Sequence, residues 1–173
     1  MSNAPSVHTG GCLCGAVRYR VAGPLRAVVM CHCTQCRRMT GHVMAATAAR
    51  RADFSLVSDG ELKWYVSSAE ARRGFCGHCG STLFWEGAGL DRISIAAGTL
   101  DDTRGLKIAC HIFVADKGEY YEIEPGAAQI RDGHFSVAFP DSRGRHGRGR
   151  HDQDSARRGA LGESLEERRR ADA

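Results

Sequence analysis

The sequence lacks a long hydrophobic run, and none of its 173 positions begins a stretch of about 18 apolar residues. The first residues, MSNAPSVHTGG, also lack the apolar segment that a secretory signal needs. These absences predict a chain without a membrane span or secretion signal, located in the reducing cytoplasm. Because disulfides are rare there, we expect the eight cysteines to be metal ligands or catalytic thiols.

A strong excess of charge of one sign is also missing. The net charge is +4, and residues 1–140 carry 15 basic and 13 acidic side chains. Domains that bind nucleic acid normally concentrate a larger positive field on one face. We therefore expect neither nucleic acid nor a membrane as the partner of this chain.

The composition changes after Pro140. Residues 141–173 are rich in Gly, Arg and Asp, show no apolar periodicity, and contain nine arginines against seven acids. Such a segment buries too little apolar surface to fold alone. We predict a flexible N-terminus over 1–8, one folded domain over 9–140 and a flexible Arg/Gly-rich tail over 141–173.

Short alternating segments predict a mainly β fold of small antiparallel sheets. In AVRYRV (16–21), apolar side chains share one face, whereas Arg18 and Arg20 share the other. This period of two is typical of half-buried strands. Further strands are predicted within 43–49, 62–67, 81–86, 91–97 and 110–115. The segment 33–41 predicts a short helical turn that Gly41 closes.

Seven of the eight cysteines form three groups. They are CLC (Cys12, Cys14), CHCTQC (Cys31, Cys33, Cys36) and CGHC (Cys76, Cys79). Alternate residues of an extended segment point the same way, and a C-x-x-C turn wraps around a metal, so both spacings suit ligation. CLC and CGHC together predict a closed structural zinc site with four thiolates. CHCTQC supplies three thiolates and predicts a second zinc with an exchangeable fourth position, as in catalytic sites.

Other interpretations of these cysteines stay open. A disulfide scaffold is disfavoured by the expected reducing location, and a redox pair at CGHC is disfavoured because no βαβ pattern surrounds it. Iron would also suit four thiolates. The group of three cysteines would be structural if a histidine completed it.

Three histidines lie close to the cysteines in sequence. His32 alternates with the neighbouring cysteines, so we expect it to face away from the metal, either behind the ligands or at the surface. His42 follows the helical turn and is a candidate to reach back as the fourth ligand. We expect His78, inside the CGHC turn, to be exposed to solvent.

A later pair of residues also bears on the site. Cys110 and His111 are adjacent in a predicted strand, so only one can face the site. We retain His111 as a candidate catalytic residue and expect Cys110 to be a buried apolar side chain.

Four segments resemble the glutathione-dependent formaldehyde-activating (GFA) family, also called the GFA/CENP-V domain. They are GGCLCGAVRY, CHCTQCRRMTG, FCGHCGSTLFW and HIFVADKGEYYEI, in the family's order and spacing over residues 9–130. The resemblance implies a β-rich fold of the β-tent type around zinc. It also implies a structural zinc at Cys12, Cys14, Cys76 and Cys79 and a catalytic zinc at Cys31, Cys33 and Cys36. This assignment agrees with the count of thiolates.

The resemblance further implies a carbon–sulfur lyase, similar to S-(hydroxymethyl)glutathione synthase. A thiol such as glutathione would add to formaldehyde or a related small electrophile, since a thiol that coordinates zinc loses its proton. His111 would protonate the nascent alkoxide. Arg37 and Arg38 would hold the glutathione carboxylates, and Gln35 and Thr40 would offer it hydrogen bonds. The alternative is a non-catalytic zinc-binding interaction module of the CENP-V type.

The sequence departs from the family at one place. After HIFV and Lys117, members often carry a Pro-Trp pair, where this chain has Glu119 and Tyr120. If that aromatic residue shapes the substrate pocket, the departure predicts a preferred thiol different from glutathione.

Overall fold

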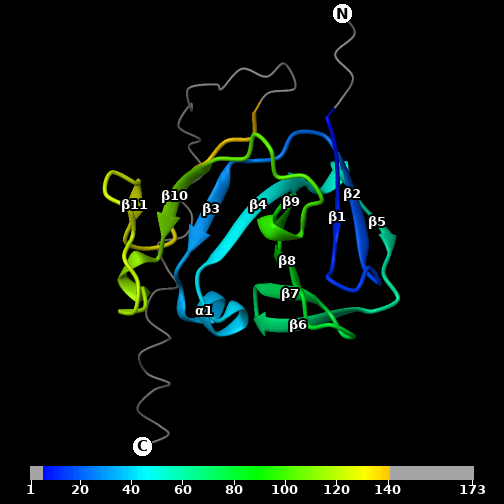
Figure 1. The fold of residues 1–173 in the computed structure, drawn as a ribbon, viewed down its shortest axis with the longest axis horizontal. Helices are drawn as coiled ribbons and strands as arrows, with labels where there is room; N and C mark the ends of the chain where they lie inside the picture. Colours follow the sequence, from blue (N-terminus) through cyan, green and yellow to red (C-terminus); the bar gives the residue numbers. More distant parts are fainter. Residues whose placement is uncertain (1–5, 141–173) are drawn as a thin grey trace, which may run out of the picture.

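The computed structural model describes residues 6–140, which form two β-sheets and one short α-helix (Figure 1). The smaller sheet has the order β1-β2-β5. Its strands are β1 (Val7–Gly11), β2 (Arg18–Ala22) and β5 (Phe54–Ser58). The larger sheet has eight strands in the order β11-β10-β3-β4-β9-β8-β7-β6. These are β3 (Val28–Cys31), β4 (Met44–Arg50), β6 (Leu62–Ser68), β7 (Ala71–Cys76), β8 (Thr82–Gly87), β9 (Arg92–Ala96), β10 (Ile108–Ile112) and β11 (Gln129–Ile130).

The predicted mainly β class is confirmed, and each of the six predicted segments overlaps a strand. Most neighbouring strands are antiparallel, but β10 runs parallel to both β3 and β11. The expected start of the folded part at residue 9 falls inside β1, because Val7 and His8 already pair with β2. Residues 1–5 and the predicted tail at 141–173 lie outside the described residues.

Among residues 6–140, helical structure is confined to short segments. The helix α1 spans Thr34–Thr40, and the 3₁₀ turns are η1 (Arg51–Asp53), η2 (Ala97–Thr99) and η3 (Val114–Asp116). The Sγ atom of Cys33 caps the first turn of α1 by accepting the backbone N–H of Cys36. Gly41 ends the helix in the left-handed conformation, φ 78°, and donates its N–H to the Arg37 carbonyl. The predicted helical turn closed by Gly41 is therefore confirmed.

Three aromatic rings join the two sheets. Tyr19 of β2 and Phe54 of β5 come from the small sheet, and Phe84 of β8 comes from the large one. Their ring centroids lie 5.3–5.8 Å apart. The Tyr19 hydroxyl is hydrogen-bonded to Thr99 Oγ1 at 2.8 Å, so the polar end of this buried ring has a partner. These rings thus join the two sheets in one hydrophobic core.

Burial of Tyr19 gives a testable dependence of stability on pH. Burial raises the pKa of Tyr19 to about 12, above the value of about 10 expected in an unfolded chain. Between these values the unfolded chain loses a proton that the folded chain keeps, so this stabilising contribution falls by about 1.4 kcal/mol per pH unit. It is fully present below pH 10.

We expect Tyr19→Phe to lower the free energy of unfolding by about 1 kcal/mol at pH 7, because a buried hydrogen bond is lost. By pH 11 the difference should disappear or reverse, since phenylalanine has no proton to lose. Urea unfolding of both proteins at the two pH values measures this change. A difference that stays constant would contradict the raised pKa.

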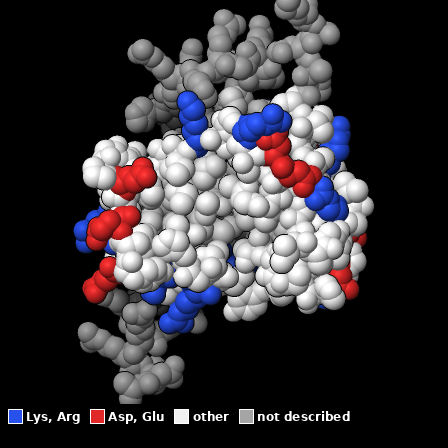
Figure 2. All heavy atoms as spheres, viewed as in Figure 1, with Lys and Arg blue, Asp and Glu red and all other residues white. Residues whose placement is uncertain are grey.

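Charged side chains are scattered over the surface. Figure 2 shows small mixed groups of basic and acidic residues on one face, with uncharged surface between them. Among residues 6–140, no helix is long and apolar enough to cross a membrane.

Candidate metal centres

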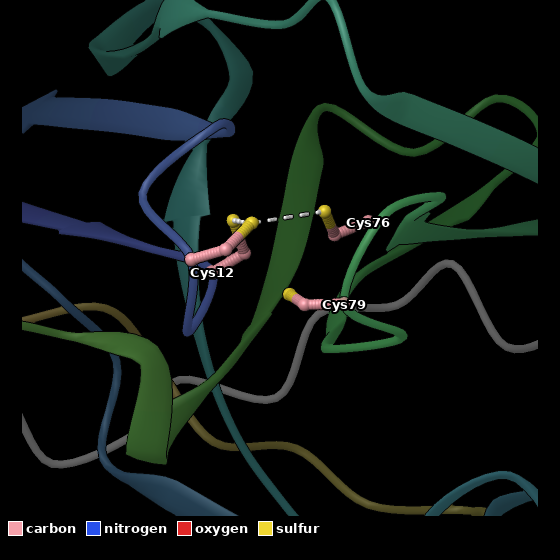
Figure 3. Close-up of side chains that lie close together, drawn as sticks. Cys12, Cys76 and Cys79 are labelled. Atoms are coloured by element: carbon pink, nitrogen blue, oxygen red, sulfur yellow. Dashed lines mark hydrogen bonds between the residues drawn. The ribbon is translucent and has the colours of Figure 1, made fainter.

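Four cysteines from two distant parts of the chain converge. The Sγ atoms of Cys12, Cys14, Cys76 and Cys79 all lie within 4.8 Å of one another (Figure 3). Cys14 Sγ lies 3.4 Å from Cys12 Sγ and 3.8 Å from Cys76 Sγ. A tetrahedral zinc with bonds of about 2.3 Å would hold its sulfurs about 3.8 Å apart. This donor set therefore fits a zinc ion with four thiolate ligands.

The turns that carry these cysteines are braced by hydrogen bonds. The Val17 N–H donates to Cys12 Sγ at 3.2 Å. Ser81 links the two turns, because its hydroxyl accepts the Leu13 N–H at 3.0 Å and lies 3.2 Å from Cys79 Sγ. The Ser81 side chain and its backbone N–H lower the pKa of Cys79 to about 5, which favours the thiolate. The cluster thus connects the β1–β2 turn to the β7–β8 turn.

The other three clustered cysteines surround the start of α1. Cys31 ends β3, Cys33 caps the helix and Cys36 lies in its first turn. Their Sγ atoms also lie within 4.8 Å of one another. Interactions with the Cys31 and Cys36 thiols lower the pKa of Cys33, which favours its thiolate form. The three sulfurs are a donor set suited to zinc.

This second cluster contains three ligands rather than four. Within residues 6–140, no other Cys, His, Asp or Glu places a ligand atom within 4.8 Å of all three sulfurs. His42, the candidate fourth ligand, lies instead against Tyr120 and Tyr121, with its ring 4.3 Å from the centroid of Tyr121. The described part of the chain therefore has the three-ligand pattern typical of catalytic zinc.

Arg73 is a component of this site that the sequence patterns did not single out. It comes from β7, is only 6% exposed, and directs Nη1 to Cys36 Sγ at 3.7 Å. Its Nη2 donates to Gln35 Oε1 at 2.9 Å. Within the described chain, no acidic side chain forms an ion pair with it. The charge of this buried guanidinium is thus directed at the thiolates.

One feature of the sequence could have identified Arg73. Arg72 and Arg73 are consecutive in a strand, and alternation must send one of them inward. Arg72 faces outward and pairs with Glu86 at 2.6 Å. An inward arginine three residues before Cys76 would have predicted a buried partner of opposite charge.

A chain of hydrogen-bonded rings lies beside the three cysteines. His32 Nε2 is 2.8 Å from His111 Nδ1, and His32 Nδ1 is hydrogen-bonded to the Tyr121 hydroxyl. His32 is 1% exposed, which excludes the surface position, one of the two that were expected for it. It is buried because β3 and β10 run side by side and place Met30 opposite His111. Tyr121 was not predicted, since a tyrosine in an irregular segment has no periodic signal.

Burial makes this chain of rings uncharged at neutral pH. Burial, together with the neighbouring His111, lowers the pKa of His32 to about 4. Burial also lowers the pKa of His111. Each imidazole therefore carries one proton, so one of its ring nitrogens donates a hydrogen bond and the other accepts one.

Four further residues that the sequence analysis considered lie outside the two cysteine clusters. Cys110 is buried with Val29 and Ile112, as expected for an apolar side chain, and His78 is exposed, as expected. The Gln35 amide accepts from Arg73 and donates to the Ser67 carbonyl. The Thr40 hydroxyl donates to backbone carbonyls of the same turn. Both side chains thus make hydrogen bonds within the protein, and each keeps further capacity for a substrate.

Comparison with known proteins identifies the family. A family model described as "Glutathione-dependent formaldehyde-activating enzyme" (GFA) matches residues 7–116. The chain belongs to the GFA family. The matched region contains all seven clustered cysteines as well as Arg73 and His111, but ends before Tyr121. The predicted family resemblance is confirmed.

A solved structure is also similar to this chain. It is the crystal structure of a Rhodobacter sphaeroides protein, a structural genomics target, with 22% sequence identity and a TM-score of 0.48. The match covers 70% of this GFA-family chain and 98% of that chain.

Proposed function

We propose that this protein is a zinc-dependent carbon–sulfur lyase, similar to S-(hydroxymethyl)glutathione synthase. It would join a thiol such as glutathione to formaldehyde or a related small electrophile, and cleave the adduct in the reverse direction. The observation that carries this proposal is the cluster of Cys31, Cys33 and Cys36 without a fourth ligand among the described residues. Membership of the GFA family supports the same thiol and electrophile.

The two clusters would have different roles. A zinc ion held by Cys31, Cys33 and Cys36 would supply the coordination position at which a substrate thiol loses its proton. Cys12, Cys14, Cys76 and Cys79 would hold a second zinc that stabilises the fold. Four thiolates fill a tetrahedral site, so this second centre offers no position to a substrate.

Arg73 would balance charge at the three-cysteine centre. Three thiolates around a divalent ion sum to one negative charge, which opposes the approach of a further thiolate. The Arg73 guanidinium contributes one positive charge against Cys36 and has no described carboxylate to neutralise it. In a buried site this attraction is weakly screened, so it favours binding of an anionic sulfur.

We expect Arg73→Gln to slow the glutathione–formaldehyde reaction and weaken zinc binding at this centre by about 10–100-fold. In cobalt-loaded protein, glutathione binding is followed by the thiolate absorption band that it induces. The pH at which half of this band has appeared should rise, because the positive charge that favours the glutathione thiolate is lost. Arg73→Lys should recover part of both effects because it keeps the charge. Arg72→Gln is the matched control, because its side chain is half-exposed and pairs with Glu86. An unchanged pH midpoint in Arg73→Gln would exclude the charge-balancing role.

His111 would supply the proton that completes the addition. When thiolate sulfur attacks the aldehyde carbon, the carbonyl π electrons move to oxygen, which then takes a proton. If the Tyr121 hydroxyl donates to His32 and His32 donates to His111, the proton of His111 lies on Nε2, away from the chain of rings. The chain would thus orient His111 as a donor to the alkoxide. The proton that it gives from Nε2 would be replaced at Nδ1 from His32, which would take one from Tyr121, and the partly exposed Tyr121 would regain its proton from water.

Arg37 would bind a carboxylate of the thiol substrate. It follows the last cysteine of the cluster, is half-buried, and its Nε has no hydrogen-bond partner among the described residues. Glutathione carries two carboxylates, which suit a guanidinium. Tyr120, where relatives often have another aromatic residue, is 62% exposed and leaves this side of the site open to thiols of different shape.

The test is the rate of exchange between free glutathione plus formaldehyde and their adduct, measured by NMR with and without zinc-loaded protein. Acceleration that depends on protein concentration is expected. No acceleration, together with a second zinc that does not respond to added thiol, would instead support a non-catalytic interaction module of the CENP-V type.

A further inference from the structure

A group of arginines lies at the end of β3 that is remote from the cysteines. Arg26 precedes β3, whereas Cys31 ends it, beside α1 (Figure 1). Arg50 ends β4 and pairs in register with Arg92 at the start of β9. The positive charges of three arginines thus lie at the same end of the neighbouring strands β3, β4 and β9.

Within residues 6–140, Arg26 is buried without a counter-ion. It is 5% exposed, and its Nη2 donates to the Ala46 carbonyl at 2.9 Å. Its Nε is buried and has no hydrogen-bond partner among residues 6–140. No described acidic side chain forms an ion pair with Arg26, Arg50 or Arg92. A buried charge without a partner is costly, so this arrangement calls for a negative group.

The proximity of like charges increases this cost. Burial, together with the positive charge of Arg92, lowers the pKa of Arg26 to about 10. Arg26 nevertheless stays protonated at pH 7, and the two guanidiniums repel each other. An anion between them would remove both the repulsion and the unpaired charge.

A cavity of about 100 Å³ lies at this place. Its lining comprises Arg26, Arg92, Phe135, Ser136, Val137 and Phe139. The Phe135 ring lies 5.6 Å from the Arg26 guanidinium, and the Phe139 ring lies 5.7 Å from that of Arg50. The cavity has room for a group of about five heavy atoms, and two aromatic rings form part of its wall.

We propose that this cavity binds a small oxyanion, a carboxylate or phosphate group held between Arg26 and Arg92. The planar fork of a guanidinium matches two oxygens of either group. Ser136 lines the same cavity and offers a hydroxyl donor. The anion comes either from solution or from the acidic residues at 141–173, and the chemistry of recognition is the same for both.

Inorganic phosphate is the probe, titrated into the full-length zinc-loaded protein while the arginine Nε–Hε signals are followed by NMR. We expect a saturable shift of the Arg26 signal with phosphate but not with chloride at equal ionic strength. Arg92→Gln should weaken phosphate binding by at least about tenfold, because one charged hydrogen-bond donor group is lost. Arg104→Gln is the control, since Arg104 is 90% exposed and pairs with Asp102; it should bind like the parent.

A second variant distinguishes the two sources of the anion. In it, every Asp and Glu of residues 141–173 is replaced by Asn or Gln within the full chain. Tighter phosphate binding by this variant would support the site and identify a carboxylate of that segment as the competing ligand. Equal binding would support the site with a free anion as its ligand.

Three results would each overturn the proposal. The first is the absence of a saturable Arg26 shift in both the parent and the variant lacking these acids. The second is an equal response of the Arg26 signal to phosphate and to chloride, and the third is equal phosphate binding by the parent and by Arg92→Gln. Zinc content and the dispersion of amide signals in Arg92→Gln check that this variant is folded.

Discussion

Replacing Cys12 with serine is expected to unfold the domain or to remove most of its stability, about 5 kcal/mol or more. Cys12 is buried, 7% exposed, and its sulfur lies among those of Cys14, Cys76 and Cys79. A structural zinc contributes its binding free energy directly to folding. Loss of one thiolate also releases the connection between the β1–β2 turn and the β7–β8 turn. Circular dichroism and urea unfolding at known zinc content measure the effect.

Cys110→Ser is the matched control for this substitution. Cys110 is also buried, 5% exposed, but it belongs to neither cluster. Its replacement places one hydroxyl in an apolar environment, at a cost of about 1–3 kcal/mol, without a change in zinc content. If Cys12→Ser is no less stable than Cys110→Ser and keeps its zinc, the structural role of the four-cysteine cluster is excluded.

Replacing Cys33 with serine is expected to leave the fold intact and lower the rate of adduct formation by about 100-fold or more. Serine is a favourable N-cap, so its hydroxyl can accept the Cys36 N–H and preserve the first turn of α1. A hydroxyl does not replace the thiolate, however, and the three-cysteine centre loses one of its three ligands. The NMR exchange assay, together with the zinc content, measures the loss.

The same assay separates catalysis from folding. The circular dichroism spectrum of Cys33→Ser should match that of the parent, and one zinc per chain should remain in the four-cysteine cluster. Full activity in this variant would exclude the three-cysteine centre from the reaction. Equal destabilisation by Cys12→Ser and Cys33→Ser would contradict the division between a structural and a catalytic site.

Local sequence determined the strands, the helix and the grouping of cysteines. The alternation around Tyr19, the cap at Cys33 and the left-handed turn at Gly41 depend on interactions over a few residues, which a single sequence contains. Cysteine spacing determines the two clusters for a similar reason. Cysteines two or three residues apart point to one ion, and the number of thiolates decides which groups combine. The position of Cys110 followed from the same alternation.

Only the tertiary structure determined what surrounds these cysteines. Arg73 reaches Cys36 across 37 residues, and His32 meets Tyr121 across 89 residues. Arg26 is covered by Phe135, which lies outside every predicted strand. These partners are set by the order of strands in the large sheet, in which β10 lies parallel to β3. Strand order depends on the packing of whole sheet faces, and the burial that gives Arg73, His32 and Arg26 their chemistry arises from that packing.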